Sequence, residues 1–118
     1  MGDESNLIES SLALLVVGTD TDVGKTVFSG LFSRYLNRRG LKVYLVKPFC
    51  SGGQEDIKFL EESCETSKGK VNYWYEDAPI APAAWELRTG EEIDFDKIIE
   101  SLRREKQRQD CDIFLVEG

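Results

Sequence analysis

Gly24, Lys25 and Thr26 follow a short apolar run, at the point where the residue pattern predicts that a helix begins. Backbone N–H groups at a helix N-terminus bind phosphate oxygens. The glycine allows close approach of the backbone, the lysine reaches the outer phosphates, and the threonine hydroxyl is placed to ligate Mg²⁺. The segment therefore predicts a phosphate-binding P-loop. Its two glycines, Gly18 and Gly24, lie one residue further apart than in the common motif.

Two more charged residues, Lys47 and Glu117, each come directly after an apolar run that reads as a strand. In open α/β sheets, ligands bind at the carboxyl ends of the strands. P-loop enzymes also place a second metal-binding carboxylate after a strand, and Glu117 fits that position. Local sequence leaves a solvated lysine and an ordinary polar residue open as alternatives. Ser51, in the proline- and glycine-bounded stretch 47–53, is uninformative by itself.

Asp56 stands near the start of a predicted helix over 56–65. A carboxylate at that position is a good helix cap. From local sequence alone, capping is therefore the favoured interpretation of Asp56.

The residues that could do chemistry must be positioned by a parallel sheet. Apolar and β-branched runs predict strands at 12–17, 42–46 and 112–116, with 47–53 as a loop. Residues 71–75 are predicted as a short aromatic strand or extended segment whose role is packing. Helical spacing predicts helices at 25–39, 56–65 and 95–109, the last capped by Asp94 or Asp96, and a short helix from Pro82 to Arg88. Alternating strands and helices predict an α/β fold with right-handed crossovers.

Composition narrows the class of protein. The 118 residues suffice for one domain, predicted as a disordered leader at 1–11 and a P-loop α/β domain at 12–118. Fifteen basic against 22 acidic residues give a net charge of −7, which argues against a nucleic-acid or anionic-membrane partner. The absence of histidine excludes histidine-based triads and histidine metal ligands. The acidic start and three unpatterned cysteines predict a cytoplasmic protein with reduced thiols.

The segment GTDTDVGKT at 18–26 resembles the P-loop of dethiobiotin synthetases, including its long glycine spacing. The resemblance continues in order through VKPFCSGG (46–53), Asp56, APIAPAAWE (78–86), GEEID (90–94) and LVEG (115–118). It implies a P-loop NTPase-type sheet and a homodimeric ligase of biotin biosynthesis that depends on Mg²⁺ and ATP. The implied reaction takes 7,8-diaminopelargonate and CO2 or bicarbonate to dethiobiotin, ADP and phosphate.

The resemblance also implies roles for individual residues. The nucleotide would contact the loop residues Asp22, Val23, Gly24, Lys25 and Thr26. Magnesium would be held by Thr26, Asp56 and Glu117. The carbamate and the transferred phosphoryl group would face Thr21, Lys47 and Ser51, so that Thr21, Lys25 and Lys47 would be the catalytic residues. Asp22 stands where the family commonly has glutamate.

Length is the main departure from the family, whose members are roughly twice as long. We therefore expect this chain to be the N-terminal part of a larger domain, inactive when isolated and prone to associate through an open sheet edge at its final strand. Two alternatives stay open: a catalytically silent nucleotide-sensing domain, and a partitioning ATPase of the ParA/MinD kind. The latter normally carries an additional lysine early in the loop, and residues 19–23 contain none.

Overall fold

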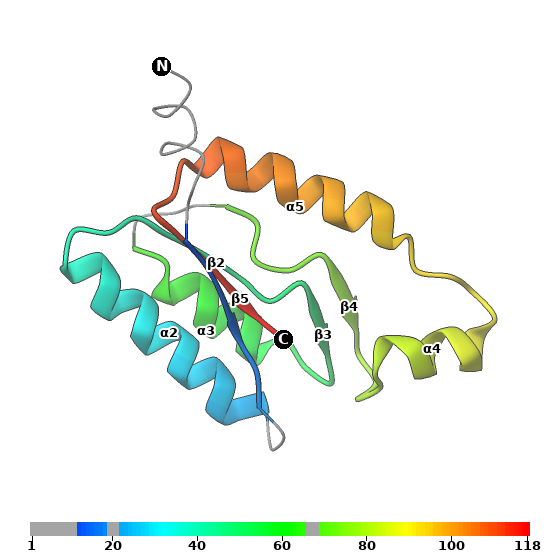
Figure 1. Cartoon of the computed structure of the whole chain (residues 1–118). Helices are drawn as coiled ribbons and strands as arrows, with labels where there is room; N and C mark the ends of the chain where they lie inside the picture. Colours follow the sequence, from blue (N-terminus) through cyan, green and yellow to red (C-terminus); the bar gives the residue numbers. More distant parts are fainter. Residues whose placement is uncertain (1–11, 19–21, 66–68) are drawn as a thin grey trace.

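The structure is a computed structural model that describes residues 12–18, 22–65 and 69–118. Its main sheet has three parallel strands in the order β1 (Leu12–Val16), β5 (Ile113–Glu117) and β2 (Val43–Val46) (Figure 1). The predicted parallel α/β fold is confirmed. The expectation that the final strand lies at an open edge is wrong, because β5 pairs with β1 on one side and with β2 on the other.

Helices cover both faces of this sheet. The helices α2 (Asp22–Arg38) and α3 (Glu55–Ser63) lie on one face, and α5 (Phe95–Gln109) lies on the other (Figure 1). Period-two alternation along the strands divides the apolar residues between two cores. The core under α2 and α3 contains Leu36, Val43, Leu45, Leu60, Val71, Ile113 and Leu115. The core under α5 contains Tyr44, Val46 and Cys111, with Leu102, Phe114 and Val116 packed against them.

A second, smaller sheet lies beside the main one. It pairs β3 (Phe49–Ser51) in parallel with β4 (Trp74–Glu76). The prediction of an uninterrupted loop at 47–53 is therefore wrong for three residues. A local pattern could not reveal this strand, because its partner lies more than twenty residues further along the chain and contributes only three residues.

The remaining helix boundaries follow the capping signals in the sequence. Pro82 opens α4 (Pro82–Thr89), and Gly90 ends it in the left-handed conformation that glycine adopts at no steric cost. Asp94 caps α5, where its carboxylate accepts a hydrogen bond from the Lys97 N–H at 3.0 Å. No helix among the described residues combines the length and apolar character needed to cross a bilayer.

Candidate functional site

The alternation that builds the α2–α3 core also aligns Lys47 with Glu117. Val43 and Leu45 of β2 face α2 and α3, so the next residue of that parity, Lys47, does too. Glu117 continues the same face of β5 beyond Ile113 and Leu115. Because Val46 is in register with Val116, the two charged residues follow side by side at the carboxyl edge of the sheet.

The two helices on that face supply the other members of a buried polar cluster. The Thr26 hydroxyl of α2 donates to Glu117 Oε2 at 2.7 Å, and Lys47 Nζ donates to the same oxygen at 2.7 Å. Asp56 Oδ2 of α3 lies 3.7 Å from Lys47 Nζ. Thr26, Lys47 and Glu117 are only 2%, 3% and 1% exposed. Such burial of charge is costly unless it is paired, so this cluster requires its internal contacts.

The other carboxylate oxygen of Glu117 is the unusual atom of the cluster. Glu117 Oε1 is buried and has no hydrogen-bond partner within the described residues. An unsatisfied buried carboxylate oxygen is expensive, which suggests a partner of another kind. Hydroxyl and carboxylate oxygens are the ligands that Mg²⁺ prefers, and Mg²⁺ usually keeps waters and substrate phosphates as its other ligands. The donor set of Thr26, Asp56 and Glu117 therefore fits a magnesium ion.

Asp56 does not cap its helix. The N-cap of α3 is Gln54, whose side chain makes no capping hydrogen bond, and Asp56 lies in the first turn beyond it. Its carboxylate instead forms the ion pair with Lys47. The capping interpretation favoured by local sequence is therefore wrong.

The P-loop lies at the same edge. Lys25 Nζ donates to the carbonyl oxygen of Gly118 at 3.4 Å, which places it next to the end of β5. A Cβ atom built on Gly24 would meet no described atom within 4 Å, so protein packing does not require glycine there and the space stays open. Thr21 lies outside the described residues. Asp22 and Val23 begin α2, and their side chains are not described.

Ser51 is not joined to the cluster. It is half-buried in β3, and among the described residues no hydrogen bond or ion pair links its side chain to Lys47, Asp56 or Glu117. The structure thus brings together four of the expected residues (Thr26, Lys47, Asp56 and Glu117) and places Lys25 beside them, but it leaves Ser51 apart.

Asn72 is a residue of the site that sequence reasoning missed. Its side-chain amide donates to the carbonyl oxygens of Lys47, Pro48 and Trp74 at 3.0, 3.2 and 2.9 Å. The Lys47 N–H also donates to the Val71 carbonyl at 2.8 Å. These bonds fix the backbone that carries the Lys47 side chain. The only signal in the sequence was a lone amide in the otherwise apolar and aromatic run 71–75.

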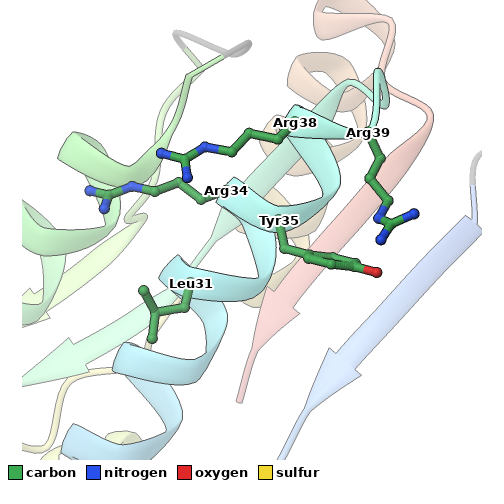
Figure 2. Close-up of a pocket in the computed structure, with 5 residues that line it drawn as sticks. All are labelled: Leu31, Arg34, Tyr35, Arg38 and Arg39. Atoms are coloured by element: carbon green, nitrogen blue, oxygen red, sulfur yellow. The ribbon is translucent and has the colours of Figure 1, made fainter.

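A second concentration of charge lies away from this edge. Figure 2 shows Leu31, Arg34, Tyr35, Arg38 and Arg39 around a pocket on the C-terminal half of α2. The Arg39 guanidinium lies 4.6 Å from the centre of the Tyr35 ring, which satisfies a cation–π contact. Thr26 is in the first turns of the same helix, so this pocket is separate from the P-loop end.

Comparison with known proteins agrees with the sequence resemblance. The chain is 31% identical over 113 residues to the ATP-dependent dethiobiotin synthetase of Hydrogenobaculum sp., covering 91% of this chain and 49% of that protein. The synthetase of Geobacillus kaustophilus is 32% identical over 111 residues, covering 90% and 46%. That of Methanococcus vannielii is 32% identical over 107 residues, covering 89% and 50%. The chain spans about half the length of these curated relatives.

A family model described as an AAA domain matches residues 13–118, which is nearly all of the described structure. This match includes the P-loop, the Lys47 segment and the strand that ends at Glu117. The resemblance to dethiobiotin synthetases is confirmed by the relatives above, and the chain belongs to the AAA domain family.

Proposed function

We propose that this chain supplies the phosphate- and metal-binding edge of a dethiobiotin synthetase. The proposed reaction is the carboxylation of 7,8-diaminopelargonate with CO2 or bicarbonate and its closure to dethiobiotin, with ATP converted to ADP and phosphate. The observation that carries the proposal is the convergence of Lys47, Asp56 and Glu117 with Thr26 beside the P-loop lysine. A silent nucleotide-sensing domain would use Thr26, Asp56 and Glu117 for a metal–nucleotide complex but would have no need of the buried ammonium of Lys47 beside them.

The P-loop residues would bind the nucleotide. Backbone N–H groups at the start of α2 and the ammonium of Lys25 carry the positive charge that phosphate oxygens require. Thr26, Asp56 and Glu117 would hold magnesium. When bound, the ion supplies charge neutralisation for the phosphate oxygens. The open space at Gly24 leaves room for the phosphates to approach the backbone.

Lys47 would act on the reacting anion. A carbamate formed on one amine of the substrate is already an anionic nucleophile, so its attack on ATP needs no histidine base. The chain contains no histidine, in agreement with this chemistry. The demand is for positioning and charge stabilisation, which a buried ammonium at the edge of the sheet can supply. Asn72 would fix the backbone from which that ammonium projects.

The complete reaction is proposed for a polypeptide of the relatives' length, since this chain spans about half of it. Recognition of adenine and of the diamine, the homodimer and the cytoplasmic location belong to the same proposal. Thr21 and Ser51 remain predicted contacts of the carbamate and the phosphoryl group.

The reaction can be tested by measuring phosphate release from ATP. In the polypeptide of the relatives' length, release should require both the diamine and bicarbonate, because the proposed nucleophile is the carbamate formed from them and not water. Omitting each in turn provides the control. Phosphate release that does not depend on the diamine would contradict the synthetase proposal.

The metal site has its own test in Asp56→Asn. The change should leave the fold intact but weaken binding of Mg²⁺–ATP, because a neutral amide stabilises a dication less than a carboxylate does. Glu62→Gln on the exposed surface of the same helix is the matched control. An unchanged magnesium dependence in Asp56→Asn would remove Asp56 from the metal site.

A further inference from the structure

Lys47 occupies the space between the two carboxylates that the metal would need. Its Nζ lies 2.7 Å from Glu117 Oε2 and 3.7 Å from Asp56 Oδ2, and its side chain is 4% exposed. Both carboxylates are acidic partners of Lys47. The ammonium thus offsets one of the two negative charges of the buried Glu117 and the partly exposed Asp56, and it reduces the repulsion between the two carboxylates.

A divalent cation and this ammonium compete for the same oxygens. If both stayed in place, three positive charges would share two carboxylates at distances of a few ångströms, in a buried environment where Coulomb interactions are strong. Glu117 Oε1 has no hydrogen-bond partner within the described residues, so an approaching cation has one uncommitted oxygen to bind first. Oε2 is already shared between Lys47 and the hydroxyl of Thr26.

We propose that Lys47 is a built-in substitute for the metal, and that binding of Mg²⁺ displaces its ammonium from Glu117 and Asp56. The inference rests on the proposed function of the site. In the metal-free protein Lys47 holds Asp56 and Glu117 in place and lowers the affinity of the site for free Mg²⁺. When the metal binds, the ammonium is released from its carboxylates and becomes available for an anion at the same edge.

This arrangement couples the two positive groups of the reaction. The Lys47 ammonium becomes available to stabilise the reacting anion only when Mg²⁺ has replaced it as the counterion of Asp56 and Glu117. Free Mg²⁺ must compete with the Lys47 ammonium for the carboxylates. Mg²⁺ that arrives with a nucleotide brings negative phosphates, and these can bind the displaced ammonium. The site therefore favours the metal–nucleotide complex over the bare ion.

The first test measures Mg²⁺ binding to this chain by calorimetry in the absence of nucleotide. Lys47→Met keeps most of the side-chain length and removes the competing charge, so its affinity for Mg²⁺ should rise at least about tenfold over that of the wild type. Lys42→Met, just before the opposite end of β2, is the matched control, because Lys42 is exposed and its ammonium pairs with the exposed Asp110. Equal or weaker Mg²⁺ binding by Lys47→Met would overturn the inference.

Removal of Lys47 also takes away the ammonium that both carboxylates contact, so the same variant should melt at a lower temperature without Mg²⁺. Millimolar Mg²⁺ should restore its melting temperature, while NaCl at matched ionic strength should not. The wild type should gain little from Mg²⁺. Failure of Mg²⁺ to raise the melting temperature of Lys47→Met would count against the substitution of one cation for the other.

A second test uses the wild type and avoids any folding defect. Acetylation of lysines by an amine-reactive reagent, followed by mass spectrometry, should find Lys47 protected without metal and reactive at saturating Mg²⁺. Lys42 should react equally in both conditions. Protection of Lys47 that persists at saturating Mg²⁺ would overturn the inference. Binding of Mg²⁺–ATP by the wild type, measured separately, tests the proposed function, so the two failures are distinguishable.

Discussion

Two regions of this molecule invert the usual distribution of polar and apolar residues. At the carboxyl edge of the sheet, Lys47 and Glu117 are buried. Beside this edge, the edge strand β1 and the helix α2 expose apolar residues, and Leu15 and Phe28 are 65% and 54% exposed. We call this second region the β1–α2 face; it comprises Leu12, Leu15, Val17, Val27, Phe28, Leu31 and Tyr35.

The two regions differ in whether contacts within the chain compensate for their free-energy cost. The buried charges compensate one another within the chain, so the carboxyl edge is complete in its pairing except for Glu117 Oε1. The β1–α2 face has no such compensation within the described residues, since β1 is an edge strand of the sheet. Buried charge at a site and exposed apolar surface both cost stability unless a further contact compensates for them.

The largest expected effect lies at the carboxyl edge. In the polypeptide of the relatives' length, Lys47→Gln should lower diamine-dependent phosphate release by a factor of about 10² to 10³, because it removes charge where the negative charge of the reaction accumulates. Nucleotide affinity, which depends on the P-loop, should change far less. Turnover and affinity are measured at saturating Mg²⁺. Normal turnover would keep the family but remove Lys47 from the mechanism.

Two glycines of α2 sharpen the contrast between its packed and open sides. A Cβ atom on Gly30 would contact the Phe59 ring and lie 2.7 Å from Ser63 Oγ, so Gly30→Ala should overpack the α2–α3 contact and cost about 1–3 kcal/mol of unfolding free energy. The methyl group of Gly24→Ala would meet no described atom within 4 Å, and the change should not destabilise the protein, because alanine favours helix. Urea unfolding checks both variants.

For ATP affinity, the order of the two glycine variants should be reversed: the effect of Gly24→Ala should be the larger one. Gly24→Ala should weaken ATP binding, because its methyl group would stand where the phosphates approach the backbone. Gly30→Ala, once folded, should bind ATP normally. Unimpaired ATP binding by Gly24→Ala would argue against phosphate contact at that position.

A smaller effect is expected from the α5 face of the sheet at high pH. Burial raises the pKa of Tyr44 above 10.0, and its hydrogen bond to Tyr73 raises that pKa further; burial also raises the pKa of Tyr73. Because both pKa values are higher in the fold than in the unfolded chain, the unfolded chain loses these protons first, so stability present below pH 10 is lost as pH rises above it. Each proton contributes a slope of about 1.4 kcal/mol per pH unit.

The variant Tyr44→Phe should therefore reduce the loss of unfolding free energy between pH 10 and 11, and the exposed Tyr35→Phe should leave it unchanged. Denaturant unfolding at the two pH values gives both slopes. At neutral pH, the loss of unfolding free energy caused by Tyr44→Phe reports the hydrogen bond that the Tyr44 hydroxyl donates to the Lys70 carbonyl at 2.6 Å. If the unfolding free energy of Tyr44→Phe and of the wild type falls equally between pH 10 and 11, the buried pair of Tyr44 and Tyr73 does not cause the loss of stability at high pH.

The smallest effect on stability is expected at the β1–α2 face. Phe28→Glu and Leu31→Glu should each change the unfolding free energy by less than about 0.5 kcal/mol, since both side chains are exposed. They should nevertheless reduce self-association of the chain, because exposed apolar surface beside an open strand edge promotes it. Sedimentation velocity distinguishes the variants. A wild-type chain that sediments as a well-behaved monomer would show that this face is tolerated without a partner.

The sequence by itself determined the local elements and the face on which each strand residue lies. The apolar run before Gly18, the capping proline at α4 and the Asp94 cap of α5 are local signals, and the corresponding elements form. The sequence also assigned Lys47 and Glu117 to one edge, because each follows a predicted parallel strand. Such periodicities are short-range consequences of backbone geometry and can be read from neighbouring residues.

Only the tertiary structure decided which elements meet. It placed β5 between β1 and β2, paired Asp56 with Lys47 in place of a helix cap, and brought Asn72 onto the backbone of Lys47. It also recruited part of the predicted loop into β3. These choices depend on contacts between residues far apart in the chain, whose free energy is shared among many partners. No local pattern records that sum, so the strand order and the partners of the buried charges became visible only in the folded molecule.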